Sequence, residues 1–359
     1  MPGIAMKIIS FYIGCLSLYI LWFLQVNETK DFFRSRIILD SRIFFMVPKF
    51  LKITFALVLF VSFMLYGLPR FFKAGYFFMK MYAANILSSQ EIWMEDLFGN
   101  EAVCLTKGGA NSACSLSSDD KTILFCHVIG ISNNGGKYSS IFEIDLDSGK
   151  IRKVLQDGNF NTGPVYSPDG KLIYFASNEG ENRDIWAMDA RINKKWKITD
   201  DKDFEDLFSL SPDGRWIVLN QKSGAGGHDI YLISTKGGKK TKIEKALTFA
   251  YDHVHTAWGP DSNEIAFFSL NKLIIAGRDG ELIDRIVFDQ MDSFSEIFFH
   301  PKDKGYIFFT ARPRASLFLD YRLYRFSRKT RECISLKELK VMQNSFDITS
   351  DGEKIVYSR

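Results

Sequence analysis

Short apolar runs separated by turn-forming residues dominate the chain from about residue 90 to its end. In the segment 165–189, a Ser-Pro-Asp-Gly turn signal precedes the apolar run Leu172–Phe175, and a polar gap separates it from a second run, Ile185–Met188. Proline presets the backbone for the first central position of a tight turn, and Asp and Gly tolerate the bend. This pattern predicts a β-hairpin.

The same hairpin recurs along the chain. Its first half, a turn signal followed by an apolar run, occurs six times, beginning at Leu116, Tyr166, Leu210, Trp258, His300 and Ile348. Its second half, typified by Asp-Ile-Trp, also occurs six times, beginning at Glu91, Ser140, Asp184, Asp229, Lys272 and Arg322. A short fourth run trails most copies. An internal period of roughly 40 to 50 residues marks a repeat architecture, and four short strands per unit form the blade of a β-propeller.

The phase of the repeats predicts how the ring closes. The repeat region begins with a third and a fourth strand, within residues 91–106, and ends with a first and a second strand, within 346–358. These two fragments complement each other, so we expect them to pair into one composite blade and to leave no free edge. The predicted fold is therefore an all-β, six-bladed propeller of four-stranded blades over residues 91–359.

The first 90 residues have a different pattern, which predicts a membrane anchor. Residues 8–26 contain no charge and are about long enough to cross a hydrocarbon core. A second run covers about 50–68, and its only charged residue is Lys52. Between the two runs, residues 27–49 carry the basic residues Lys30, Arg34, Arg36, Arg42 and Lys49. The positive-inside rule places this loop in the cytoplasm and the propeller on the extracytoplasmic, periplasmic side.

An alternative reading begins the protein at Met46 and uses the second run as a signal anchor. It gives one membrane span in place of two, and both readings put the propeller on the far side of the membrane.

The repeat units at 167–188 and 211–233 resemble the TolB-type propeller repeat, with its "SPDG(K/R)" turn and "DIW" or "DIY" strand. They differ from WD-repeat propellers, because the Gly-His and Trp-Asp dipeptides are missing. The resemblance covers about 90–359 and implies a TolB-like six-bladed propeller. TolB itself carries an α/β domain ahead of its propeller, whereas this chain has the expected membrane hairpin there, so the resemblance implies a TolB-like protein and not TolB.

Composition narrows the functional classes. The net charge of +4 is too small to indicate nucleic-acid binding. No Walker loop, GxGxxG motif or GxSxG nucleophile elbow is present. The five cysteines show no CxxC spacing, so we expect buried or unpaired thiols, with Cys104–Cys114 or Cys114–Cys126 as alternatives in an oxidising compartment.

Candidate ligand-binding residues come from the loop that leads into each innermost strand, which lies at the mouth of a propeller channel. Six places before each turn lie Asn111, Asn161, Glu205, His253, Phe294 and Gln343. The fourth copy also contains His255, so the expected polar rim comprises Asn161, Glu205, His253, His255 and Gln343. The repeated aspartates Asp119, Asp169, Asp213, Asp261 and Asp351 are interpreted as turn caps rather than metal ligands.

His253 and His255 alternate along one strand face, and two imidazoles at this spacing can ligate a divalent transition metal. Oligogalacturonate lyases, propellers with related repeats, use such a pair, and the resemblance here is limited to these two histidines. We expect a membrane-tethered, non-catalytic module that binds an envelope protein or a glycan, with no cofactor. The alternative is a metal-dependent, glycan-active enzyme that uses His253 and His255.

Overall fold

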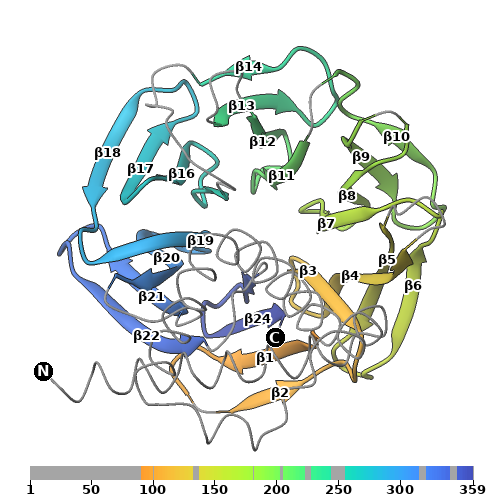
Figure 1. The fold of residues 1–359 in the computed structure, drawn as a ribbon, viewed down its shortest axis with the longest axis horizontal. Helices are drawn as coiled ribbons and strands as arrows, with labels where there is room; N and C mark the ends of the chain where they lie inside the picture. The colour runs from red at the N-terminus through yellow and green to blue at the C-terminus, as the bar shows by residue number, and fades with distance from the viewer. Residues whose placement is uncertain are drawn as a thin grey trace, which may run out of the picture. The chain divides into compact units, whose positions relative to one another are not determined.

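The computed structural model describes residues 90–99, 101–131, 137–180, 182–202, 205–222, 228–243, 255–314, 321–339 and 346–358. The chain divides into two units, residues 1–80 and 81–359, and all of the described residues belong to the second. They form a six-bladed β-propeller, in which each blade is a four-stranded antiparallel sheet (Figure 1). This confirms the fold expected from the repeats.

Blades 1 to 3 follow one another in chain order, with each blade running from its innermost to its outermost strand. Blade 1 contains β3 (Ala110–Leu116), β4 (Thr122–Ile131), β5 (Lys137–Asp145) and β6 (Ile151–Leu155). Blade 2 contains β7 (Asn161–Tyr166), β8 (Leu172–Ser177), β9 (Asp184–Asp189) and β10 (Lys195–Lys197). Blade 3 contains β11 (Glu205–Leu210), β12 (Trp216–Lys222), β13 (His228–Ser234) and β14 (Thr241–Lys242).

Blades 4 and 5 continue this order, and a sixth blade combines both ends of the repeat region. Blade 4 contains β15 (Thr256–Trp258), β16 (Glu264–Ser269), β17 (Lys272–Gly277) and β18 (Leu282–Val287). Blade 5 contains β19 (Met291–His300), β20 (Asp303–Pro313), β21 (Tyr321–Ser327) and β22 (Cys333–Leu339). The composite blade contains β23 (Phe346–Ile348), β24 (Lys354–Ser358), β1 (Ile92–Asp96) and β2 (Ala102–Cys104).

The composite blade closes the ring through the pairing of β1 with β24, as the phase of the repeats led us to expect. Ile92 lies opposite Ser358 and Asp96 lies opposite Lys354, so the two strands pair along their whole length. The side chains of Ile92 and Val356 are fully buried. Two segments more than 240 residues apart in sequence thus form the centre of one sheet.

The hydrophobic core lies between the blades. Six clusters of buried side chains each join two neighbouring blades. One of them joins the composite blade to blade 1 and so continues the core around the ring. The second strand of each blade is covered on both faces, which explains why β8 and β16 are almost continuously buried. Between blades 4 and 5 this core is aromatic, because Phe268, Phe288, Phe294 and Phe309 pack together there.

The expected membrane spans at 8–26 and 50–68 lie outside the described residues. Within the described part of the chain, no helix has the length and apolar character needed to cross a membrane.

Candidate functional site

The two faces of the propeller differ in how their strands are connected. The turn face carries the connections from first to second strand and from third to fourth strand. The first-to-second connections span five residues in five of the six blades, for example 167–171 and 211–215. The opposite face, here called the loop face, carries the connections from second to third strand and between blades. There the second-to-third connections range from two residues, 270–271, to seven, 314–320.

On the turn face, the repeated aspartates hold their own turns. Asp169 Oδ1 accepts hydrogen bonds from the hydroxyl of Ser167 at 2.7 Å and from the backbone N–H of Lys171 at 3.1 Å. Gly170 takes a positive φ of 67° and donates its N–H to the carbonyl of Ser167. The hydroxyl, the Lys171 N–H and the Lys171 side chain lower the pKa of Asp169 to about 2.

The other copies repeat this arrangement, which confirms the interpretation of the aspartates as turn caps. Asp119, Asp213 and Asp351 each accept a hydrogen bond from the Ser or Thr two places earlier and from the N–H two places later. Asp261 lacks the hydroxyl partner, because Gly259 replaces the serine, but it accepts the Asn263 N–H.

Turns of neighbouring blades are also linked to each other. The Ser118 hydroxyl donates to the Pro168 carbonyl at 2.9 Å, and the Asp213 N–H donates to Ser262 Oγ at 3.0 Å. The Ser350 N–H donates to the Asp120 carboxylate at 3.0 Å, which joins the composite blade to blade 1. The turn face is therefore occupied by structural contacts between the blades.

On the loop face, Asn161 is the predicted site residue that the structure describes most fully. Its side chain is 0% exposed. Its Nδ2 donates to Asp157 Oδ1 at 2.9 Å, and its backbone N–H donates to Ser139 Oγ at 2.8 Å. Ser139 belongs to β5 of blade 1, so this hydrogen bond joins Asn161 of blade 2 to blade 1.

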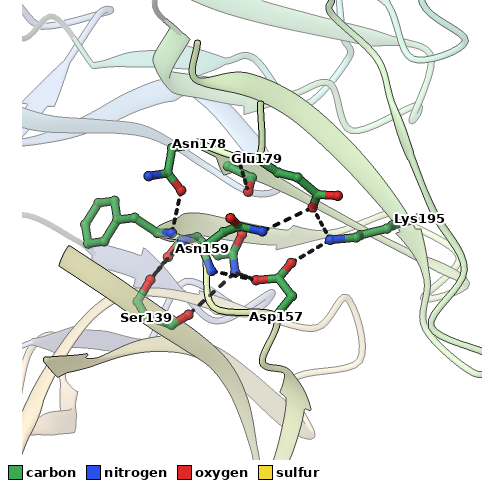
Figure 2. A network of polar contacts seen from close by, with 9 residues as sticks. Ser139, Asp157, Asn159, Asn178, Glu179 and Lys195 are labelled. Atoms are coloured by element: carbon green, nitrogen blue, oxygen red, sulfur yellow. Dashed lines mark hydrogen bonds and ion pairs between the residues drawn. The ribbon is translucent and has the colours of Figure 1, made fainter. Parts of the chain in front are cut away.

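Asp157 belongs to a wider network of polar contacts at this place. Lys195 Nζ lies 2.5 Å from Asp157 Oδ2 and also contacts Glu179, while Asn159 Nδ2 donates to Glu179 at 3.3 Å (Figure 2). Burial raises the pKa of Asp157, but hydrogen bonds from Lys195 and Asn161 outweigh it, so the pKa lies below its ordinary value. The carboxylate is thus stabilised in its charged form.

Blade 3 repeats part of this network. Lys240 Nζ lies 2.7 Å from Asp201 and 5.7 Å from the centre of the Tyr231 ring, just as Lys195 lies 5.3 Å from the Trp186 ring. In both blades, a lysine at the outermost strand pairs with an aspartate of the linker that leads into that blade. Because the arrangement recurs in two blades, we interpret this lysine–aspartate pair as a contact that stabilises the blade.

A second polar contact joins blades 4 and 5, between the residue that precedes β15 and the middle of β19. His255 Nδ1 lies 3.0 Å from Glu296 Oε2, and the two side chains are 20% and 10% exposed. The Glu296 N–H donates to Thr310 Oγ1 at 3.1 Å, which holds its backbone. Glu296 Oε1 is buried and has no hydrogen-bonding partner in the part of the chain that the structure describes.

Glu296 is a residue that the sequence analysis missed. It lies four places before the turn residue His300, as His255 lies four places before Gly259. Counting back six places selected Phe294 instead, which packs against Phe268 at a ring distance of 4.1 Å. The pairing of β19 with β20 is irregular between Phe294 and Ile297, and such an irregularity redirects side chains. The available signal was an acidic residue directly before the apolar run Ile297–Phe299 of the innermost strand.

The remaining predicted residues fall in different places. His253 and Gln343 lie outside the described residues, and of Glu205 the structure describes only the backbone, which begins β11. Asn111 is buried, and its Nδ2 donates to Thr106 and Gly108. His300 lies at the far end of β19, in the turn, so it does not accompany His255.

The described chain contains no group of three or more His, Cys, Asp or Glu residues that could hold a metal ion. No disulfide joins Cys104, Cys114, Cys126 or Cys333.

Comparison with known proteins supports the fold. No family model matches the chain. A protein assigned as TolB from Agrobacterium tumefaciens superposes with a TM-score of 0.59 at 18% identity, covering 76% of this chain and 98% of that chain. The fold is that of a TolB-like six-bladed β-propeller.

Two other solved structures share the architecture at lower identity. A chain of a nidogen/laminin complex has a TM-score of 0.54 at 7% identity and covers 71% of this chain and 97% of that chain. An oligogalacturonate lyase in complex with manganese has a TM-score of 0.50 at 13% identity and covers 74% of this chain and 77% of that chain. TolB-like propellers therefore share their fold with binding proteins and with an enzyme, and the fold does not choose between these functions.

Proposed function

We propose that this TolB-like propeller is a binding module, tethered to a membrane by residues 1–90, that engages an envelope protein or a glycan through its loop face. The observation that carries the proposal is the difference between the two faces. The turn face is uniform and held by contacts such as Ser118–Pro168 and Asp213–Ser262. The connections on the loop face differ in length from blade to blade on the same scaffold, and such variation is typical of a binding surface.

The tether and the side of the membrane rest on the sequence. The uncharged runs at 8–26 and 50–68 and the basic loop 27–49 support an anchor with the propeller outside the cytoplasm. Cys104 provides a test, because it is exposed on β2. A membrane-impermeant maleimide added to intact spheroplasts should label the wild type and not the Cys104→Ser variant. Labelling of Cys104 only after lysis would place the propeller in the cytoplasm.

Site-specific photo-crosslinking tests the binding face. A photoreactive amino acid at the loop-face positions Asn178 or Asn182 should capture a partner from the envelope of cells that express the full chain. The same residue at Lys150 or Lys239, both exposed in turn-face hairpins, is the matched control. Capture from the turn-face positions alone would contradict the assignment.

A metal-dependent, glycan-active enzyme is the second candidate function. The observation in its favour is that Glu296 brings a carboxylate to His255 and keeps one oxygen without a partner in the described structure. Imidazole and carboxylate together suit divalent transition metals. His255 and Glu296 would then hold the metal, together with His253 as the sequence suggests.

Metal analysis separates the two candidates. The full chain, purified in detergent, is loaded with Mn²⁺ or Zn²⁺, dialysed and measured by elemental analysis. The enzyme reading expects about one equivalent of metal in the wild type and its loss in both the His253→Ala/His255→Ala and the Glu296→Gln variants. Retention of metal in these variants, or its absence from the wild type, would contradict that reading.

A further inference from the structure

Residues 157–161, which connect β6 of blade 1 to β7 of blade 2, read Asp-Gly-Asn-Phe-Asn. Side chains that carry oxygen therefore occur at every second position. The same spacing opens the loop of an EF-hand, in which the side chains at positions 1, 3 and 5 bind Ca²⁺. The spacing alone identifies no site, because Thr162 stands where an EF-hand loop has glycine.

In the folded protein, these side chains converge with Glu179 (Figure 2). Asn161 Nδ2 donates to Asp157 Oδ1 at 2.9 Å, and Asn159 Nδ2 donates to Glu179 Oε2 at 3.3 Å. The Lys195 ammonium contacts both Asp157 Oδ2 and Glu179 Oε2. These two carboxylate oxygens therefore lie close enough together to share one cation.

The Asn161 side chain gives independent evidence for a ligand at this place. The residue is 0% exposed, and its Oδ1 is buried without a hydrogen-bonding partner in the part of the chain that the structure describes. A half-turn of the amide would exchange Oδ1 with Nδ2, and Oδ1 would then face Asp157 Oδ1, which repels it. A cation held between the amide oxygen and the carboxylate satisfies both groups.

The local charge also favours a cation. The two carboxylates carry two negative charges, and Lys195 supplies one positive charge to them. In blade 3, by contrast, Lys240 contacts the Asp201 carboxylate and the neutral amide oxygen of Gln221, the latter at 2.8 Å. The blade 2 cluster thus keeps one negative charge that its lysine does not neutralise.

We propose that Asp157, Asn159, Asn161 and Glu179 form a Ca²⁺ site on the loop face between blades 1 and 2, in which Lys195 holds the place of the ion until it binds. Ca²⁺ takes carboxylate oxygens, amide oxygens and water together, so two carboxylates suffice when amides complete the set. The side chains of Asp157, Lys195 and Glu179 are 17%, 22% and 36% exposed, so the ion can enter from solvent.

Terbium luminescence tests the site in the detergent-purified full chain after treatment with EDTA. Tb³⁺ binds the same oxygen ligands as Ca²⁺ and emits when a nearby tryptophan is excited. The Trp186 ring lies 5.3 Å from Lys195 Nζ, so an ion in that place should emit strongly, and Ca²⁺ should displace it. Trp186→Phe should lose most of this emission and keep the Ca²⁺ affinity that calorimetry measures.

Three substitutions at the site and one control have defined outcomes. Asp157→Asn and Glu179→Gln should each weaken Ca²⁺ binding about tenfold, because each removes a charged ligand. Lys195→Gln should tighten it about tenfold, because the ion no longer competes with the ammonium. A lysine that only stabilised the blade would not have this effect. Asp201→Asn removes the carboxylate that pairs with the blade 3 lysine and should leave the Ca²⁺ affinity unchanged.

Two results would overturn the proposal. One is the absence of Ca²⁺ binding, at about 1 mM Ca²⁺, from both the wild type and Lys195→Gln. The other is an affinity that stays the same in Asp157→Asn and Glu179→Gln. If Asp157→Asn fails to fold, Glu179→Gln decides alone, because Glu179 is the more exposed of the two carboxylates.

Discussion

His255 Nδ1 lies 3.0 Å from Glu296 Oε2, and this contact joins the entry to β15 of blade 4 to β19 of blade 5. Both side chains are largely buried, so each depends on the other to offset its loss of water. The contact matters to either candidate function, because it fixes the orientation of the one described histidine of the predicted rim.

Removing the His255 side chain should destabilise the protein more than removing only the charge of Glu296. We expect His255→Ala to lower the free energy of unfolding by about 1–3 kcal/mol, because it leaves the Glu296 carboxylate buried without its partner. Glu296→Gln keeps an oxygen that can accept the His255 N–H and should cost less. Urea denaturation of both variants measures the difference, and a larger loss for Glu296→Gln would contradict this reading.

Gly352 should be the least replaceable glycine of the turn face. It has a φ of 78°, and a Cβ atom built there would collide with the His300 ring. Gly170 has a similar φ of 67° but no neighbour within 4 Å, so it reports the backbone strain alone. We expect Gly170→Ala to cost about 1 kcal/mol and Gly352→Ala clearly more.

The double variant His300→Ala/Gly352→Ala isolates the contact with the ring. It should recover the excess cost of Gly352→Ala over Gly170→Ala, as measured by thermal unfolding. If the excess persists without the imidazole ring, the collision with His300 is not its cause.

The charge of Asp169 should stabilise the protein only above strongly acidic pH. Its pKa is lowered to about 2, chiefly by the Ser167 hydroxyl and the Lys171 N–H. The folded state therefore holds the proton less tightly than the unfolded chain, and stability from this group is lost as the pH falls through 2. Asp169→Asn should be less stable than the wild type at pH 7, with the difference shrinking between pH 4 and pH 2.

Asp147→Asn is the control for this pH series, because Asp147 is an exposed aspartate in the hairpin between β5 and β6. It makes the same change of charge outside a Ser-Pro-Asp-Gly turn. An equal loss of stability in both variants at pH 7 would show that general charge, and not the turn, is responsible.

Closure of the ring should depend on the inner face of the composite blade. Val356 on β24 is 0% exposed and pairs with Met94 of β1, whereas Val103 on β2 is 58% exposed. We expect Val356→Asp to abolish the cooperative thermal transition, because a buried, unpaired charge separates the two ends of the repeat. Val103→Asp makes the same substitution on the same blade and should change stability by less than about 0.5 kcal/mol.

The four-strand repeat and its phase could be predicted from the sequence, because turn signals and apolar runs depend only on residues close together in the chain. The six blades and the pairing of β1 with β24 followed from it. The role of Asp169 was also local, since its partners, Ser167 and Lys171, lie two places away.

Contacts between blades required the tertiary structure. Asn161 was selected as a rim residue, yet its amide is buried against Asp157 and Ser139, because β7 enters the ring beside β5. Glu296 could not be selected by counting along the repeat, because the pairing of β19 with β20 is irregular. Its partner, His255, lies 41 positions earlier on another blade. The sequence by itself determined the repeat and the closure of the ring, since both are written in short-range patterns. Only the tertiary structure decided which polar side chains meet, because the register and bulges of neighbouring blades set those distances.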